Sequence, residues 1–126
     1  MLKEDPLTPR IIGAAIKVHS ALGPGLLEKA YERCLEHKLT VEGFDVQTQL
    51  AIPIQFEGLV IPDAYRIDLL VNSTVLVELK SVEKLHETHL AQVITYLKLS
   101  KLNYGLLLNF NCVRLSDGIK RVLNDS

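Results

Sequence analysis

Residues 65–80 read YRIDLLVNSTVLVELK, and this stretch decides the fold. Two β-rich runs flank Asn72-Ser73-Thr74, a composition typical of turns, so the stretch predicts a β-hairpin. Three ionised side chains, Asp68, Glu78 and Lys80, interrupt the apolar runs. Charged groups within such runs are costly unless they are paired or bind a metal ion. The hairpin is therefore both the expected centre of a sheet and a candidate site.

Hydrophobic periodicity on both sides of the hairpin predicts the remaining elements. The Gly23-Pro24-Gly25 segment separates two helical patterns, a period of two begins near Phe44, and Glu57-Gly58 is expected to form a tight turn. The segment 114–123 has no clear assignment. The expected helices cover about 9–22, 26–40 and 86–100, and the expected strands about 44–56, 65–71, 75–80 and 104–110. This order, α-α-β-β-β-α-β, predicts an α/β (α+β) fold in which helices flank a mixed central sheet.

Length and composition limit the class of protein. A chain of 126 residues fits one domain, expected over 1–126. Its 48% apolar and 23% charged residues exclude disordered and low-complexity classes. The apolar runs are too short to cross a bilayer, and the charged amino terminus is unlike a secretory signal. Cys34 and Cys112 have apolar neighbours and are expected to be buried, reduced thiols, so we expect a soluble, cytoplasmic protein without a membrane partner.

The charge balance and the absence of common motifs narrow the function. Fourteen basic and fifteen acidic residues give a formal net charge of −1 without any block of like charge. A dedicated nucleic-acid binder usually shows a basic excess, although a bound metal ion can supply positive charge to a nuclease. The sequence has no phosphate-binding glycine loop, dinucleotide fingerprint, serine-hydrolase elbow or His-Glu-x-x-His helix. ATPases, dinucleotide enzymes, serine hydrolases and zinc proteases are thus unsupported.

The charges on the hairpin have two interpretations. In the first, Asp68 and Lys80 form a salt bridge and Glu78 is solvated. In the second, Asp68 and Glu78 bind Mg²⁺ or Mn²⁺, because a hard cation takes one or two carboxylates together with waters and a substrate phosphate. Glu78 and Lys80 share a strand face, so Lys80 could orient or deprotonate an attacking water. This second arrangement suits hydrolysis of a phosphodiester.

The length of the hairpin loop decides whether the second interpretation is geometrically allowed. A two-residue loop would place Asp68 opposite Val77, with its side chain on the face away from Glu78. A three-residue loop would place Asp68 directly opposite Glu78, and a β-bulge would have the same effect. A shared site therefore requires an odd loop or a bulge, although two-residue loops are the commonest hairpin closures.

Several motifs, taken together, resemble a known family. Asp68 followed by Glu78-Leu79-Lys80 resembles the D…(D/E)xK signature of the PD-(D/E)XK nuclease superfamily. The segment Gly25-Leu26-Leu27-Glu28-Lys29-Ala30-Tyr31 matches the naming motif of the GxxExxY family, a small branch of that superfamily, and Gln92-Val93-Ile94-Thr95-Tyr96 resembles its QxxxY helix. The segments 105–110 and 117–121 also resemble the GxxExxY pattern. The resemblance extends from about Ile11 to Val122 and implies a restriction-endonuclease-like αβββαβ core.

The resemblance implies roles for named residues. Asp68 and Glu78 correspond to metal ligands, Lys80 to the catalytic lysine, and Glu28 to a helix carboxylate that can complete the metal shell. Glu28 has an alternative role, a favourable charge in the first turn of its helix. One departure concerns Asp63, which follows Pro62 as the family signature suggests but precedes the strand proper, so it is kept as a reserve for Asp68.

The third helix is expected to contribute further residues. Gln92 and Tyr96 are four residues apart, so they share a helix face and can both meet the site. Their alternative role is packing and capping of a polar edge. His89 lies on the same face and is interpreted as a neighbour, and His19 as a hydrogen-bonded core histidine.

Two functions of different classes follow from these residues. The resemblance implies a nuclease, dependent on Mg²⁺ (or Mn²⁺), that hydrolyses phosphodiester bonds of DNA. The alternative is a nuclease-fold accessory module that binds nucleic acid or protein, with weak, lost or partner-dependent activity. The near-zero net charge and small size favour this alternative somewhat. A homodimer or an accessory protein partner is compatible with either function.

Overall fold

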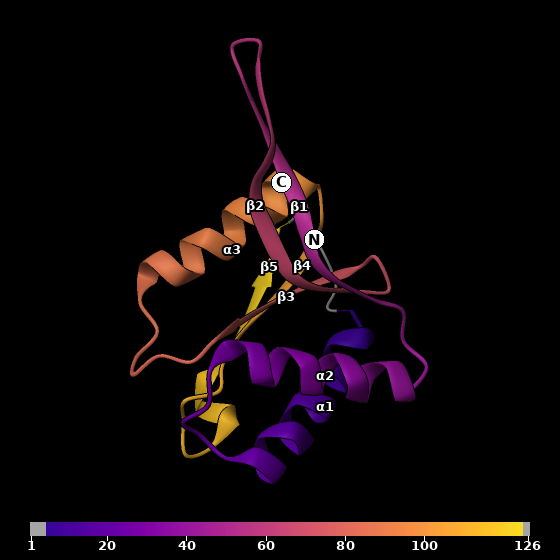
Figure 1. The fold of residues 1–126 in the computed structure, drawn as a ribbon, viewed down its shortest axis with the longest axis vertical. Coiled ribbons are helices and arrows are strands. Elements are labelled where there is room, and N and C mark those ends of the chain that lie inside the picture. The colour runs from indigo at the N-terminus through magenta and orange to yellow at the C-terminus, as the bar shows by residue number, and fades with distance from the viewer. Residues whose placement is uncertain (1–4, 125–126) are drawn as a thin grey trace.

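The computed structural model describes residues 5–124 and places them in a five-stranded mixed sheet with helices on both faces (Figure 1). The elements are α1 (Leu7–Leu22), α2 (Glu28–Val41), β1 (Val46–Phe56), β2 (Leu59–Val71), β3 (Val75–Lys80), α3 (Glu87–Ser100), β4 (Tyr104–Asn109), the 3₁₀ turn η1 (Leu115–Gly118) and β5 (Ile119–Leu123). The strands lie in the order β1-β2-β3-β4-β5. The pair β3–β4 is parallel and joined by α3, and the other neighbours are antiparallel. The predicted fold class is confirmed, and β5 fills the segment that the sequence left unassigned.

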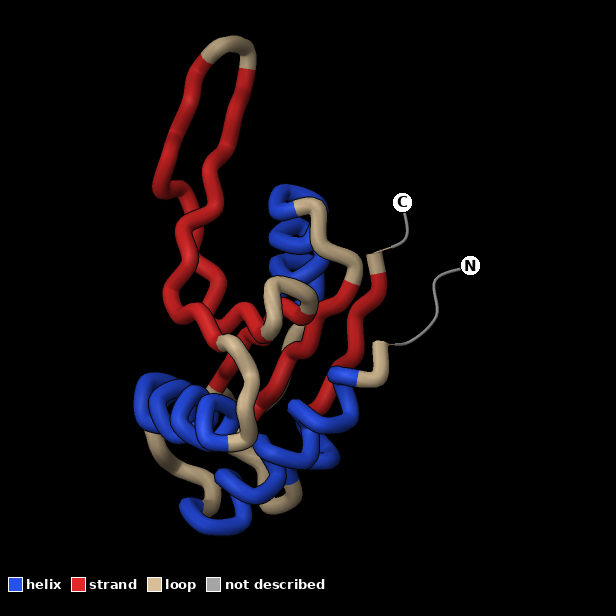
Figure 2. The backbone as a smooth tube through the Cα atoms, turned by 90° about the vertical axis from the view of Figure 1, so that its right-hand side faces the viewer, coloured by secondary structure: helices blue, strands red, loops and turns tan. Residues whose placement is uncertain are grey.

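Two apolar cores lie on opposite faces of the sheet, under the α1–α2 pair and under α3 (Figure 2). Alternation along β3 explains the division, because Val77 and Leu79 join the α1–α2 core whereas Leu76 joins the α3 core. Glu78 and Lys80 have the same parity as Leu76. They therefore belong to the face of the sheet that α3 covers.

The burial of α2 differs from the prediction, since the helical pattern of the sequence predicts that Leu27, Ala30, Tyr31, Cys34 and Leu35 are buried. The helix buries apolar residues at four-residue spacing, namely Tyr31, Leu35 and Leu39. This phase turns Leu27, Ala30 and Cys34 outward, and Leu27 is 80% exposed. The expectation of two buried thiols was therefore wrong: Cys34 is exposed and Cys112 half-buried, and both are free. No helix within residues 5–124 combines the length and apolarity that a membrane span needs.

The strands β1 and β2 extend beyond the rest of the sheet as a long two-stranded ribbon (Figures 1 and 2). Its closing turn is Glu57-Gly58, as predicted, with φ angles of 47° and 86°. Positive φ at both central residues is the requirement of a two-residue type I′ hairpin turn. The ribbon is thus a pre-formed element, and its base leads into the hairpin that carries Asp68.

The carboxy-terminal segment packs closely against the end of β4. A Cβ atom on Gly118 would collide with the carbonyl oxygen of Asn109, whereas a Cβ on Gly13, inside α1, would meet nothing within 4 Å. Gly118 is therefore required for close backbone approach. Gly13 has no such role, and glycine within a helix is less favourable than alanine.

The two glycines should respond to alanine in opposite directions. Gly118→Ala should lower the free energy of unfolding by about 1–3 kcal/mol, because the backbone has to move away from the new methyl group. Gly13→Ala should raise it by about 0.5–1 kcal/mol. Urea unfolding of both variants checks this, and equal effects would contradict the packing of Gly118 on Asn109.

Candidate active site

The turn between β2 and β3 determines which side chains share a face. Val71 pairs with Val75, so the loop contains three residues, Asn72-Ser73-Thr74. The first two have φ angles of 51° and 52°, and the last is the additional residue before pairing resumes. Continuation of this register places Asp68 opposite Glu78. The odd loop that a shared site requires is confirmed.

Asp68 and Glu78 interlock where the backbone ladder of these strands ends. The last paired residues are Leu69 and Val77. Beyond them, the amide of Asp68 donates a hydrogen bond to Oε1 of Glu78 at 2.9 Å, and the amide of Leu79 donates to Oδ2 of Asp68 at 2.9 Å. Each carboxylate is therefore held by an amide of the opposite strand. These hydrogen bonds orient both side chains.

The structure excludes the first interpretation of the hairpin charges, in which Asp68 and Lys80 form a salt bridge and Glu78 is solvated. Glu78 is only 4% exposed, and burial, followed by the negative charge of Asp68, raises its pKa to about 8, against the opposing effects of the Asp68 amide and of Lys80. Within residues 5–124, the ion pairs involve other side chains and none joins Asp68 to Lys80. Glu78 is thus buried rather than solvated. Two close carboxylates are a donor set that a divalent cation stabilises.

Lys80 ends β3, and its backbone is fixed by neighbouring strands and loops. The amide of Phe110 donates to the carbonyl of Lys80 at 2.9 Å. The buried side chain of Asn109 forms two hydrogen bonds with Val82, accepting from its amide at 3.1 Å and donating to its carbonyl at 2.9 Å. The segment 105–110 thus holds the loop that follows Lys80 in place through Asn109 and Phe110.

Tyr31, the last residue of the Gly25–Tyr31 motif, has a structural role. Its hydroxyl donates to the carbonyl of Gly23 at 2.6 Å and accepts from the amide of Leu26 at 3.1 Å. Its ring stacks on Phe110 with centroids 4.4 Å apart. Tyr31 therefore anchors the loop before α2 to the core beneath the sheet.

Glu28, at the start of α2, lies beside the end of β3. Ser81 donates from its hydroxyl to the carbonyl of Leu26 at 2.5 Å and from its amide to Oε1 of Glu28 at 3.3 Å. Glu28 is exposed and begins the helix, so its position is compatible with the alternative role, a favourable charge in the first turn. Across the described residues, no three Asp, Glu, His or Cys side chains are grouped so that they could hold a metal ion together. Mg²⁺ is commonly held by two carboxylates and waters, so Asp68 and Glu78 remain a sufficient donor pair.

Sequence reasoning missed Gln49, which lies next to Asp68, and Glu32, which is connected to Asp68 through Gln49. Nε2 of Gln49 donates to Oε1 of Glu32 at 2.7 Å and lies 3.3 Å from Oδ1 of Asp68. Glu32 is buried and also contacts Nζ of Lys29 at 3.3 Å. Gln49 has a left-handed φ of 51° within β1. The one available signal was the spacing of Glu32 from Glu28, which puts both on one face of α2.

The residues expected from α3 divide between packing and the site. Tyr96 is buried, with its ring centroid 5.3 Å from that of Tyr65. Burial, followed by the charge of Glu78, raises the pKa of Tyr96 to about 12, and a hydrogen bond with Gln92 acts in the opposite direction. The structure therefore brings Tyr96 and Gln92 together near the carboxylates. Their part in the chemistry remains a prediction.

Residues that the sequence left as neighbours or reserves have other partners. Nδ1 of His89 accepts a hydrogen bond from the amide of His86 at 3.0 Å, which caps α3. His19 is buried, and its Nε2 lies 2.8 Å from the carbonyl oxygen of Cys112, as expected of a core histidine. The prediction that Asp63 precedes the strand was wrong, because β2 begins at Leu59 and contains it. The Asp63 side chain is exposed, and Nη2 of Arg66 lies 2.7 Å from its Oδ2. Asp68, and not Asp63, is the aspartate that meets Glu78.

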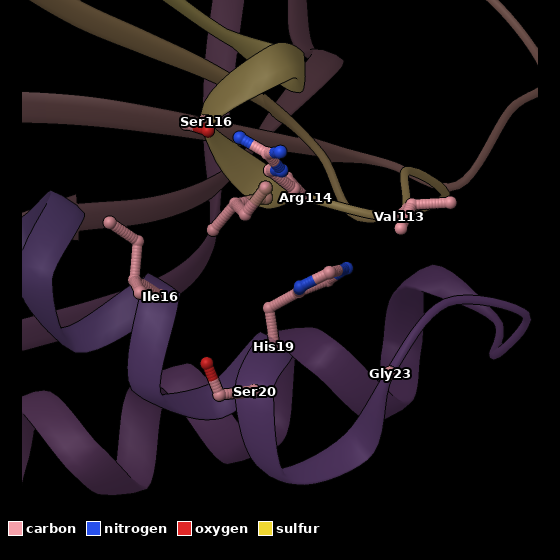
Figure 3. Close-up of a pocket in the computed structure, with 8 residues that line it drawn as sticks. Ile16, His19, Ser20, Gly23, Val113, Arg114 and Ser116 are labelled. Carbon is pink, nitrogen blue, oxygen red and sulfur yellow. The ribbon is translucent and has the colours of Figure 1, made fainter.

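Two surface hollows differ in position, and neither is lined by the carboxylates of Asp68 and Glu78. A hollow of ≈ 400 Å³ lies between α1 and the segment 113–116 (Figure 3). Its lining includes His19 and Arg114 but no Asp or Glu, so it lacks hard-cation donors. A second hollow, of ≈ 610 Å³, is formed by the loop after Lys80 and the start of α3. The residues that line this second hollow follow Lys80 in the chain, and neither Asp68 nor Glu78 is among them.

The metal-free protein should lose stability as the pH rises, through Glu78. Its raised pKa means that the folded state keeps a proton between pH 4.5 and about 8 that the unfolded state has lost. The free energy of unfolding therefore falls across this range, by at most about 1.4 kcal/mol per pH unit. Urea unfolding with a chelator should show that Glu78→Gln removes this fall. An identical pH dependence in both proteins would contradict the raised pKa.

Comparison with known protein families gives a match that covers most of the chain. A family model described as PD-(D/E)XK nuclease superfamily matches residues 5–122. Comparisons with curated proteins and with solved structures gave no match. The matched range begins just before α1 and ends within β5, so it contains both cores, the β2–β3 hairpin and Lys80. The chain therefore belongs to the PD-(D/E)XK nuclease superfamily.

Proposed function

We propose that this protein is a nuclease of the GxxExxY branch that uses Mg²⁺ or Mn²⁺ to hydrolyse phosphodiester bonds of DNA. The observation that carries the proposal is the face-to-face arrangement of Asp68 and Glu78, each held by an amide of the opposite strand. Lys80 has the strand parity of Glu78 and follows it by two residues. Membership of the superfamily supports a nucleic-acid substrate.

Asp68 and Glu78 are the proposed ligands of the cation. Their fit to a hard cation rests on oxygen donors whose burial and mutual repulsion raise the pKa of Glu78, since a bound cation would offset both costs. A cation held there supplies positive charge to the scissile phosphate and acidifies a bound water. Glu28 does not group with this pair as a third direct ligand, so it is proposed to reach the cation through a bound water; its contact with Ser81, which follows Lys80, supports this.

Lys80, Gln92 and Tyr96 are proposed to act on the water and the phosphate. The ammonium group of Lys80 would orient the attacking water by hydrogen bonding. With a pKa of about 12, Tyr96 keeps its hydroxyl proton at neutral pH and remains a donor to a phosphate oxygen. The amide of Gln92, whose interaction with Tyr96 favours the ionised hydroxyl, would orient that hydroxyl.

An accessory module is the second candidate function. The net charge of −1 supports it, because phosphate contacts of a dedicated binder come from Lys and Arg side chains. Such a module would keep the fold and the carboxylate pair but would cleave DNA weakly, or only with a partner. DNA cleavage by the purified chain separates the two functions.

Cleavage should depend on the metal ion and on Lys80. Purified protein should nick or degrade single-stranded, double-stranded or branched DNA with Mg²⁺ or Mn²⁺, and a chelator should stop it. Lys80→Met should lower the rate at least about a hundredfold, because it removes the amine that acts in the chemical step. Lys17→Met, on the exposed side of α1, which packs on the other face of the sheet, is the matched control and should cleave normally.

Two results would count against the nuclease. Normal cleavage by Lys80→Met would remove Lys80 from the chemistry. Inactivity of the wild-type protein on all three DNA forms, with either metal ion, would favour the accessory module.

A further inference from the structure

The tip of the β1–β2 ribbon carries an exposed apolar face. Phe56 pairs with Leu59, and Ile54 pairs with Ile61. Paired residues lie on the same side of a hairpin, as do alternate residues along each strand, so these four side chains share one face. Phe56 is 64% exposed, Leu59 58% and Ile61 42%, and Ile54 is half-buried. We refer to Ile54, Phe56, Leu59 and Ile61 as the apolar ribbon face.

The structure around the apolar ribbon face indicates a contact surface. The tip of the ribbon stands clear of both helical layers (Figures 1 and 2), and none of the described helices packs on it. The type I′ turn at Glu57-Gly58 holds the face in shape before any partner arrives. The largest apolar patch on a monomer covers about 300–600 Å² and is often functional.

The charges of the ribbon disfavour nucleic acid as the occupant. Residues 51–65 contain no Lys or Arg, and their charged side chains are Glu57 and Asp63. The nearest basic residue, Arg66, is paired with Asp63. A phosphate backbone binds through basic side chains, and an acidic ribbon would repel it. The apolar ribbon face therefore suits a protein surface that is itself apolar.

We propose that a second copy of this chain covers the apolar ribbon face, so that two ribbons pack face to face around a twofold axis in a homodimer. A twofold interface brings identical patches together, and the four side chains of each face are complementary because all are apolar and none is charged. Glu57 lies in the turn at the edge of this contact. No like charges become buried against each other.

The size of the patch sets the expected strength. Four large side chains at these exposures present on the order of 400 Å² per copy. A standard stable interface buries roughly 800 Å² per partner. The dimer is therefore a weak one whose population depends on protein concentration. Along β2, Asp68 lies roughly 20 Å from Ile61 at the rise of a strand, so this contact leaves the carboxylate pair uncovered.

Sedimentation equilibrium with a matched pair of double variants tests the dimer. Phe56→Ser with Ile61→Ser removes the centre of the apolar ribbon face, and Gln55→Ser with Val60→Ser changes the adjacent residues on the opposite face. Wild type and the Gln55/Val60 variant should dimerise as concentration rises through the micromolar range. The Phe56/Ile61 variant should dissociate at least about tenfold more readily. A reducing agent excludes disulfides through the exposed Cys34.

Three outcomes would overturn the proposal: a wild-type protein that stays monomeric, a Phe56/Ile61 variant that dimerises normally, or a Gln55/Val60 variant that loses the dimer. Circular dichroism should show the same secondary structure in all three proteins, because none of the substituted side chains is buried in a core. Sedimentation does not depend on cleavage. Failure of the dimer is therefore distinguishable from failure of the proposed nuclease function.

Discussion

The crossed hydrogen bonds between Asp68 and Glu78 are the interaction on which the rest of the site depends. Each carboxylate replaces a backbone partner where the β2–β3 ladder ends, and each is held by an amide of the other strand. These contacts keep two acidic groups together inside the protein, although burial and repulsion disfavour the ionised form of Glu78. A cation is the simplest group that would stabilise both charges, and this is the physical basis of the proposed metal site.

The two helical layers meet at this pair from opposite faces of the sheet. On one side, Gln49 connects the buried Glu32 of α2 to Asp68. On the other side, the charge of Glu78 acts on Tyr96 of α3. Side chains of both helical layers thus act on the carboxylate pair, which does not line the hollow between α1 and η1.

Local patterns predicted most of the fold, because alternation and helical periodicity report which face of an element is buried. They predicted the β2–β3 hairpin and the Glu57-Gly58 turn, but they did not decide the loop length between β2 and β3. That loop depends on a non-local contact: the amide of Asn72 donates to the carbonyl of Asp45, and the amide of Asp45 donates to Oδ1 of Asn72. The Gln49 bridge was missed for the same reason, since its partners are distant in sequence. The exposure of Cys34 depends on the phase in which α2 packs, which periodicity alone left open.

The central claim is that Asp68 and Glu78 together bind a divalent cation, and anomalous diffraction from crystals grown with Mn²⁺ tests it most directly. We predict an anomalous difference peak in contact with an oxygen atom of each of the two carboxylates. Crystals of a variant carrying Asp68→Asn and Glu78→Gln should lack this peak, because the amides keep the shape but not the charge. The absence of a peak between Asp68 and Glu78 at saturating Mn²⁺, or an equal peak in the variant, would contradict the account.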